Sequence, residues 1–134
     1  MKKMTQGQGL RREERLRGKH ELELLFAEGR KGYAGPLRYF WHVRPCDEGA
    51  EAECLPSVLF SVPKRFLKRA NKRNLMKRRT REAYRLNKQQ LLMAAAEKRV
   101  DVRVAFVYNT AMVHDYKTVE NGVRNALGKI QKSL

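Results

Sequence analysis

The chain has 134 residues, of which 42% are hydrophobic, and carries a formal net charge of +16 at pH 7. This length fits one domain with a real core, and the hydrophobic fraction excludes a disordered basic tail, which would lack apolar surface to offset the entropy of ordering. No stretch approaches the roughly 20 apolar residues of a membrane span, and the start has no apolar segment of signal-peptide length. We therefore predict a cytoplasmic protein.

Residues 1–9 have the composition of a flexible basic arm, and residues 10–134 are predicted to form a single domain. The first predicted helix covers about residues 19–28, because Leu22, Leu25 and Phe26 are spaced i, i+3 and i+4. Gly29 follows at the position where a left-handed cap often ends a helix.

Residues 37–44 alternate as a strand does, so that two sets of side chains point to opposite faces. The set expected in the core consists of Leu37, Tyr39, Trp41 and Val43. The opposite set consists of Arg38, Phe40, His42 and Arg44. This second face is either a solvated surface with one aromatic ring or a surface on which unpaired RNA bases stack.

Residues 45–56 are predicted to form a loop between hairpin strands, and they include Cys46 and Cys54. Free thiols are expected in a reducing compartment, with a disulfide as the less favoured alternative. A zinc site that also used His42 would have only three ligands at irregular spacing.

Further along the chain we predict a strand at residues 57–62, a helix at about residues 70–96 and a strand at residues 100–108. Asn71 is a candidate cap for the middle helix, and a last helix follows Asp115. The last helix has one apolar stripe, formed by Val119, Val123, Ala126, Leu127 and Ile130. The order helix, strand, strand, helix, strand, helix predicts an α+β two-layer sandwich.

The most informative segment is residues 64–81, which hold ten Lys or Arg and no acidic residue. At about 100° per residue, the helix in this region has a basic arc opposite an apolar arc. The basic arc contains Arg73, Asn74, Lys77, Arg78, Arg81 and Arg85. Lys72 and Arg79 project toward the apolar arc, so we expect them to run along the core and to be structural.

A solvated helix face usually interleaves acids with bases, and this face has no acid before Glu82. The pattern therefore favours nucleic acid as the partner. Asn74 is almost the only uncharged group on this face that could contact a base edge, so phosphate and shape recognition, typical of folded RNA, is favoured over recognition of a DNA sequence.

Motifs of common enzymes are absent: there is no P-loop, Rossmann glycine pattern, HExxH or GxSxG. Asp101, Asp115 and Glu120 could bind a metal together, but their spacing does not predict it, and capping or solvated roles are favoured. We assign no catalytic and no metal-binding residue, and we do not expect a self-sufficient nuclease.

The segment KRANKRNLMKRRTREAYR resembles the signature of the bacterial ribonuclease P protein component. That signature has K-R-A, then R-N-x-x-K-R-x-x-R-E, then an aromatic residue. The matching positions are Lys68, Arg69, Ala70, Arg73, Asn74, Lys77, Arg78, Arg81, Glu82 and Tyr84. Arg15, Leu16 and residues 26–29 also resemble the N-terminal part of that family, and the resemblance covers roughly residues 11–131.

The resemblance implies a mostly antiparallel central sheet with an uncommon left-handed βαβ crossover, as in ribosomal protein S5 domain 2-like folds. It implies a protein subunit of a ribonucleoprotein endoribonuclease that removes the 5′ leader of precursor tRNA, with the catalytic centre and the Mg²⁺ mainly in the RNA subunit. The expected partners are this catalytic RNA and precursor tRNA, with no DNA and no membrane. The alternatives are a ribosomal-protein-like module or RNA chaperone without a role in tRNA cleavage, and a protein-only nuclease.

The resemblance also implies two sets of site residues. The RNA-binding set is Lys64, Arg65, Lys68, Arg69, Arg73, Asn74, Lys77, Arg78 and Arg81. The set expected in the leader-binding cleft is Leu22, Phe26, Arg38, Phe40 and His42. The chain departs from the family pattern at four positions. The family often has an aromatic residue in place of Leu22, small residues in place of Leu59 and Pro63, and an arginine in place of Leu75.

Overall fold

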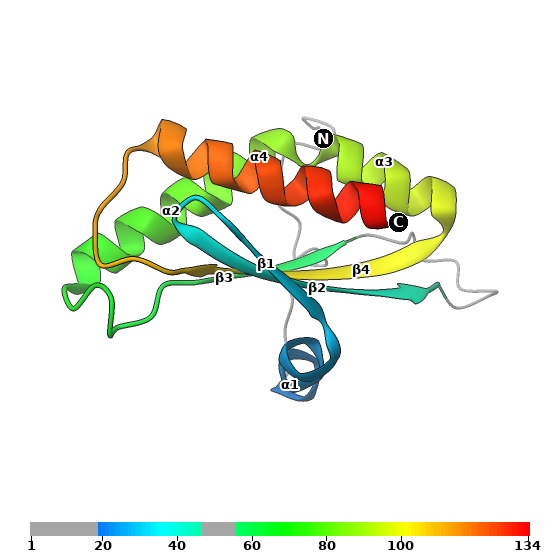
Figure 1. Ribbon diagram of the computed structural model, residues 1–134, viewed down its shortest axis with the longest axis horizontal. Coiled ribbons are helices and arrows are strands. Elements are labelled where there is room, and N and C mark those ends of the chain that lie inside the picture. Colours follow the sequence, from blue (N-terminus) through cyan, green and yellow to red (C-terminus); the bar gives the residue numbers. More distant parts are fainter. Residues whose placement is uncertain (1–18, 47–55) are drawn as a thin grey trace, which may run out of the picture.

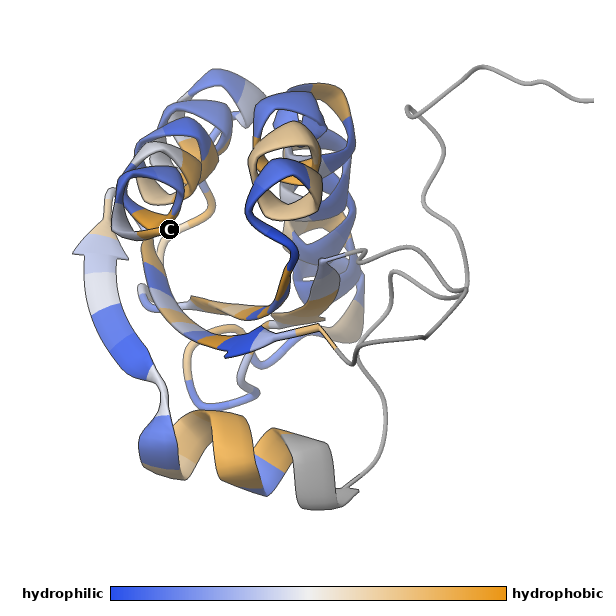
Figure 2. Ribbon diagram, turned by 90° about the vertical axis from the view of Figure 1, so that its right-hand side faces the viewer, coloured by the Kyte–Doolittle hydropathy of each residue, from blue (hydrophilic) through white to orange (hydrophobic). Residues whose placement is uncertain are grey.

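The computed structural model describes residues 19–46 and 56–134, and in these ranges it contains a four-stranded sheet with helices on both faces (Figure 1). The strands are β1 (Arg30–Ala34), β2 (Leu37–Pro45), β3 (Ser57–Ser61) and β4 (Val100–Tyr108). The helices are α1 (Lys19–Glu28), α2 (Ala70–Asn87), α3 (Gln89–Lys98) and α4 (Tyr116–Ser133). Helix α1 lies alone on one side of the sheet, and the other helices lie on the opposite side (Figure 2).

The strand order is β1-β2-β4-β3. Strand β2 pairs antiparallel with both β1 and β4, whereas β3 pairs parallel with β4. Because β4 lies between β2 and β3, the prediction that these two strands form a hairpin is wrong. The chain passes from β3 through α2 and α3 before it returns as β4, which is the βαβ crossover expected in this fold. The predicted α+β sandwich with a mostly antiparallel sheet is confirmed.

The main core lies between the sheet and helices α2–α4, and it uses the strand faces that alternation predicted. Leu37, Tyr39 and Trp41 of β2 are buried there, and Val43 packs against the same cluster. The predicted apolar stripe of the last helix is also buried. Asp115 is the N-cap of α4, where its carboxylate accepts a hydrogen bond of 2.9 Å from the backbone N–H of Thr118.

A second, smaller core lies on the other face of the sheet. Leu25 of α1 packs there with Phe40 of β2 and Ala105 of β4, and Leu22 and Leu59 pack against them while partly buried. Alternation along β2 therefore serves two cores, because one set of side chains faces α2–α4 and the other faces α1.

The structure contains a strand that sequence alone did not predict. Strand β1 precedes the two-residue turn Gly35–Pro36, in which Gly35 has a φ of +57° that suits glycine. It is an edge strand whose residues are mostly exposed, so its sequence RKGYA shows no alternation of apolar and polar residues.

Three local predictions about the helices are wrong. The expected single helix at residues 70–96 is two helices, which meet at the fully buried Lys88. The N-cap of α2 is Arg69 and not Asn71. Gly29 is not left-handed. It is needed because a Cβ there would lie 2.4 Å from the carbonyl oxygen of Leu25 and 2.9 Å from that of Trp41.

Cys46 is disulfide-bonded, so the prediction of a free thiol is wrong for this residue. Cys54, the proposed basic arm at residues 1–9 and the resemblance at Arg15 and Leu16 lie outside the described residues. Across residues 19–46 and 56–134, none of the helices has the length and apolar character that crossing a membrane requires.

Candidate RNA interface

The basic segment forms a loop and the first half of α2. Leu67 is buried in the main core and holds the loop against the domain, while the backbone N–H groups of Phe66 and Leu67 both donate to the carbonyl of Pro63. We call the outward-facing predicted residues of this segment the basic surface. They are Lys64, Arg65, Lys68, Arg69, Asn74, Arg78 and Arg81, which are exposed, and Lys77, which is half-buried.

Arg73 belongs to the same predicted set but is held by the protein itself. One terminal nitrogen of its guanidinium donates to the carbonyl of Leu67 at 2.9 Å and to the carbonyl of Lys68 at 2.7 Å. These bonds tie the loop to the first turns of α2. Because charge-assisted bonds of this kind are comparatively strong, Arg73 fixes the loop relative to α2.

Arg79 and Lys72, the two basic side chains predicted to be structural, differ in their surroundings. The guanidinium of Arg79 donates to the backbone carbonyl of His114 in the β4–α4 loop, which supports a structural role. Lys72 is exposed at the start of α2, which does not support the predicted structural role. Leu75, which stands where the family often has an arginine, is partly buried against the main core.

Two arginines of the basic surface are oriented by aromatic rings. The Cζ atom of Arg65 lies 4.9 Å from the ring centroid of Phe66, and that of Arg81 lies 5.8 Å from the ring centroid of Phe60. A guanidinium that is stacked on a ring keeps its planar edge available for hydrogen bonds to phosphate.

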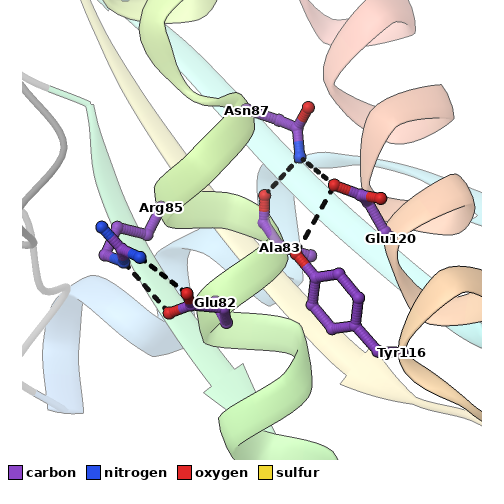
Figure 3. A network of polar contacts seen from close by, with 6 residues as sticks. All are labelled: Glu82, Ala83, Arg85, Asn87, Tyr116 and Glu120. Atoms are coloured by element: carbon purple, nitrogen blue, oxygen red, sulfur yellow. Dashed lines mark hydrogen bonds and ion pairs between the residues drawn. The ribbon is translucent and has the colours of Figure 1, made fainter.

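The basic surface ends at Glu82, where charges begin to pair within the protein. Both carboxylate oxygens of Glu82 accept hydrogen bonds from Arg85, at 3.0 and 2.6 Å (Figure 3). The hydrogen bond from Arg85 lowers the pKa of Glu82, so this acid stays ionised. Arg85 was grouped with the basic arc by helical geometry, but its cation is already matched.

A second set of polar contacts joins the end of α2 to α4. The side-chain amide of Asn87 donates to the carbonyl of Ala83 and to Glu120, and Glu120 also accepts from the hydroxyl of Tyr116 (Figure 3). These contacts fix the last turn of α2 against α4, so the basic half of the helix projects from a rigid support.

The five residues predicted for the leader-binding cleft all lie on α1 or on the face of β2 that α1 covers. Phe26 and Phe40 form an edge-to-face pair with ring centroids 4.7 Å apart. The Cζ atom of Arg38 lies 4.8 Å from the ring centroid of Phe40. Leu22 packs on the small core. His42 lines a cavity of about 200 Å³ together with Glu28, Arg30, Trp41, Val43 and Ser133.

The two rings of this face differ in accessibility. Phe40 is only 8% exposed, whereas Phe26 is 43% exposed. Phe26 is therefore the accessible ring of the pair, and Phe40 packs against it. Tyr33 of β1, which the sequence prediction omitted, also presents a ring on this face, beside Arg38. Tyr33 could have been found from the sequence only if strand β1 had been predicted, because its pairing with β2 places Tyr33 beside Arg38.

The carboxylates considered as a metal site do not come together. Asp101 pairs with Arg44 and Arg103, Asp115 caps α4, and Glu120 binds Asn87 and Tyr116. In the part of the chain that the structure describes, no three His, Cys, Asp or Glu side chains could hold a metal ion.

The fold and the basic surface together define a class of protein: an α+β sandwich with a cationic helix in its βαβ crossover. The family model for Ribonuclease P matches residues 10–131. The ribonuclease P protein component of Porphyromonas gingivalis is 35% identical over 122 residues, which cover 91% of this chain and 86% of that protein. The chain therefore belongs to the ribonuclease P protein family, and the predicted role as a protein component of this tRNA-processing endoribonuclease is confirmed.

Solved structures show the same fold. The ribonuclease P protein of Staphylococcus aureus aligns with a TM-score of 0.64 at 16% identity, covering 89% of this chain and 95% of that one. The ribonuclease P protein of Thermotoga maritima aligns with a TM-score of 0.63 at 22% identity, covering 87% and 96%. These likenesses support the crossover topology, in which α2 and α3 connect the neighbouring strands β3 and β4.

Proposed function

We propose that the basic surface binds the catalytic RNA subunit of ribonuclease P and that the α1 face of the sheet binds the 5′ leader of precursor tRNA. The observation that carries this proposal is the division of the molecule into two surfaces. Cations without acidic neighbours lie on the loop and on α2. On the opposite side of the sheet, the accessible ring of Phe26 packs against Phe40, and the guanidinium of Arg38 lies over the Phe40 ring.

The physical chemistry of the two surfaces differs, as their partners would. The basic surface carries charge and few base-reading groups, which suits the phosphate backbone of a folded RNA. On the α1 face, a planar ring and a guanidinium suit unpaired bases, which stack without strong sequence preference.

Catalysis would remain with the RNA, which would hold most of the Mg²⁺ and supply the hydrolytic chemistry. The chain would bind the catalytic RNA on one side and the leader on the other, and it would thereby hold the scissile phosphate near the RNA-bound metal. Positioning and charge screening are sufficient roles for such a subunit.

The test is cleavage of precursor tRNA at low Mg²⁺ by the catalytic RNA alone, by the protein alone and by both together. We expect cleavage to be strongly stimulated when both are present and to be absent with the protein alone. If the protein fails to stimulate the RNA, the proposal is lost.

The leader-binding part is tested separately with Phe26→Ala. This variant should weaken binding of precursor tRNA by about 1 to 3 kcal/mol, the cost of one lost base stack, and leave binding of mature tRNA unchanged. Equal losses for the two RNAs would count against a leader site on the α1 face.

A further inference from the structure

A row of three aromatic rings and one guanidinium extends beyond the predicted leader site, from α1 across β2 to β1 at the free edge of the sheet. It begins with the pair Phe26 and Phe40, whose centroids are 4.7 Å apart. Arg38 follows, with its Cζ atom 4.8 Å from the Phe40 centroid and 5.8 Å from the Tyr33 centroid. The strand register explains the last step, because Tyr33 of β1 pairs directly with Arg38 of β2.

Tyr33 is not used by the fold. Its ring is 61% exposed and belongs to neither core. Edge strands that need only protection from aggregation commonly carry charges, and β1 already has Arg30 and Lys31 exposed for that purpose. An exposed ring beside these cations is the combination found where single-stranded nucleic acid binds.

Arg38 is also incompletely satisfied. Its Nε atom is buried and has no hydrogen-bond partner, although most buried polar groups have one. The guanidinium lies over two rings, so a base stacked on Tyr33 would have its phosphate or an acceptor edge close to a fixed cation.

We propose that Tyr33 and Arg38 form a second stacking position for the leader of precursor tRNA, distinct from the position at Phe26. This inference rests on the proposed function, because it assumes that the leader crosses the α1 face. The three steps of 4.7, 4.8 and 5.8 Å make the row at most about 15 Å long. At roughly 3.4 Å per stacked nucleotide, and more when the strand is extended, the two positions are separated by about two to four nucleotides.

The experiment combines ring removal with an abasic nucleotide scanned through the leader. The full chain is assembled with its catalytic RNA, and affinity for each precursor is measured under conditions that block cleavage. In the wild type, an abasic nucleotide weakens binding at both stacking positions. We call the loss of affinity that an abasic nucleotide causes the abasic penalty. Tyr33→Leu should weaken binding of the intact precursor about 5- to 30-fold, the lower part of the range for one stacked base. It should also abolish the abasic penalty at one leader position only.

Phe26→Leu should abolish the penalty at the other position, two to four nucleotides away. Tyr33→Phe keeps the ring and should behave as the wild type, and Arg38→Met should reduce the penalty at the Tyr33 position. Met93→Ala is the matched control, because Met93 is 68% exposed on α3, on the opposite side of the sheet. It should change nothing.

The possible failures are distinguishable. If Tyr33→Leu weakens all leaders equally, or none, while Phe26→Leu removes one abasic penalty, the second position does not exist and the proposed leader site stands. If both variants leave every penalty unchanged, the leader does not cross the α1 face, and the proposed function of that face fails as well.

Discussion

Removal of two cations from α2 gives the sharpest test of the basic surface. Arg78 and Arg81 are exposed, and neither makes a hydrogen bond to the protein that would be lost with the guanidinium. Each phosphate contact contributes about 0.7 to 0.9 to the slope of log affinity against log salt. The variant Arg78→Gln/Arg81→Gln should therefore lower the slope for the catalytic RNA by about 1.4 to 1.8.

The slope change converts into a measurable ratio. If the seven cations of the basic surface each meet a phosphate, affinity should fall by about three to four orders of magnitude between 50 and 200 mM salt. In the double variant this fall should be smaller by about 7- to 12-fold. The assay is a salt titration of binding to the catalytic RNA. Arg85→Gln is the matched control, since its cation is already paired with Glu82 on the same helix. An unchanged slope in a folded double variant would refute the assignment.

Two further predictions concern α4. Gly128 has open space around the position of a Cβ, so Gly128→Ala should raise the free energy of unfolding by about 0.5 to 1 kcal/mol, measured by denaturant unfolding. A Cβ at Gly122 would instead lie 2.7 Å from the carbonyl oxygen of Ala34, so Gly122→Ala should lower the free energy of unfolding by about 1 to 3 kcal/mol. Equal effects of the two would contradict the packing described. Hydrogen bonds from Thr118 lower the pKa of Asp115, so its carboxylate stabilises the fold at neutral pH and loses this contribution as pH falls through the lowered pKa. The gap in thermal midpoint between wild type and Asp115→Ala should be widest above about pH 5 and narrow below about pH 4, and a gap independent of pH would show that the cap is not ionic.

The elements predicted correctly are those whose residues carry a complete signal in their own sequence. Strand β4 has an apolar residue at every second position from Val100 to Tyr108, and its bounds match the prediction. Helix α4 has both a capping residue, Asp115, and an apolar stripe. In each case local propensity and burial agree, so nothing in the tertiary structure overrides the pattern.

The elements predicted incorrectly depend on contacts that no local pattern reports. Strand β1 is held at the sheet edge by backbone pairing with β2, and its mostly exposed side chains leave no periodic trace. The division between α2 and α3 occurs at Lys88, in a segment without Gly or Pro, so composition predicts an uninterrupted helix. Gly29 was predicted to be a helix cap because glycine often ends helices. Here glycine is needed because the backbone carbonyls of Leu25 and Trp41 leave no room for a Cβ.

The candidate site was also predicted correctly only where the local sequence pattern determines the side-chain positions. Helical geometry correctly grouped the cations that face outward, but it could not show that the guanidinium of Arg73 turns back to two carbonyls of the preceding loop. Spacing along β2 grouped Phe40 with Arg38 and His42, but it could not show which ring is accessible. That depends on α1, whose Phe26 lies against Phe40.

The two proposed surfaces are connected through the sheet. Along β2, residues of one parity pack under α2–α4 and residues of the other parity pack under α1, so neighbouring residues such as Tyr39 and Phe40 belong to different cores. The same backbone therefore fixes the support of the basic helix and the position of the rings on the α1 face. A rigid central strand of this kind would hold the leader at a constant distance from the catalytic RNA, which is what a positioning subunit must do.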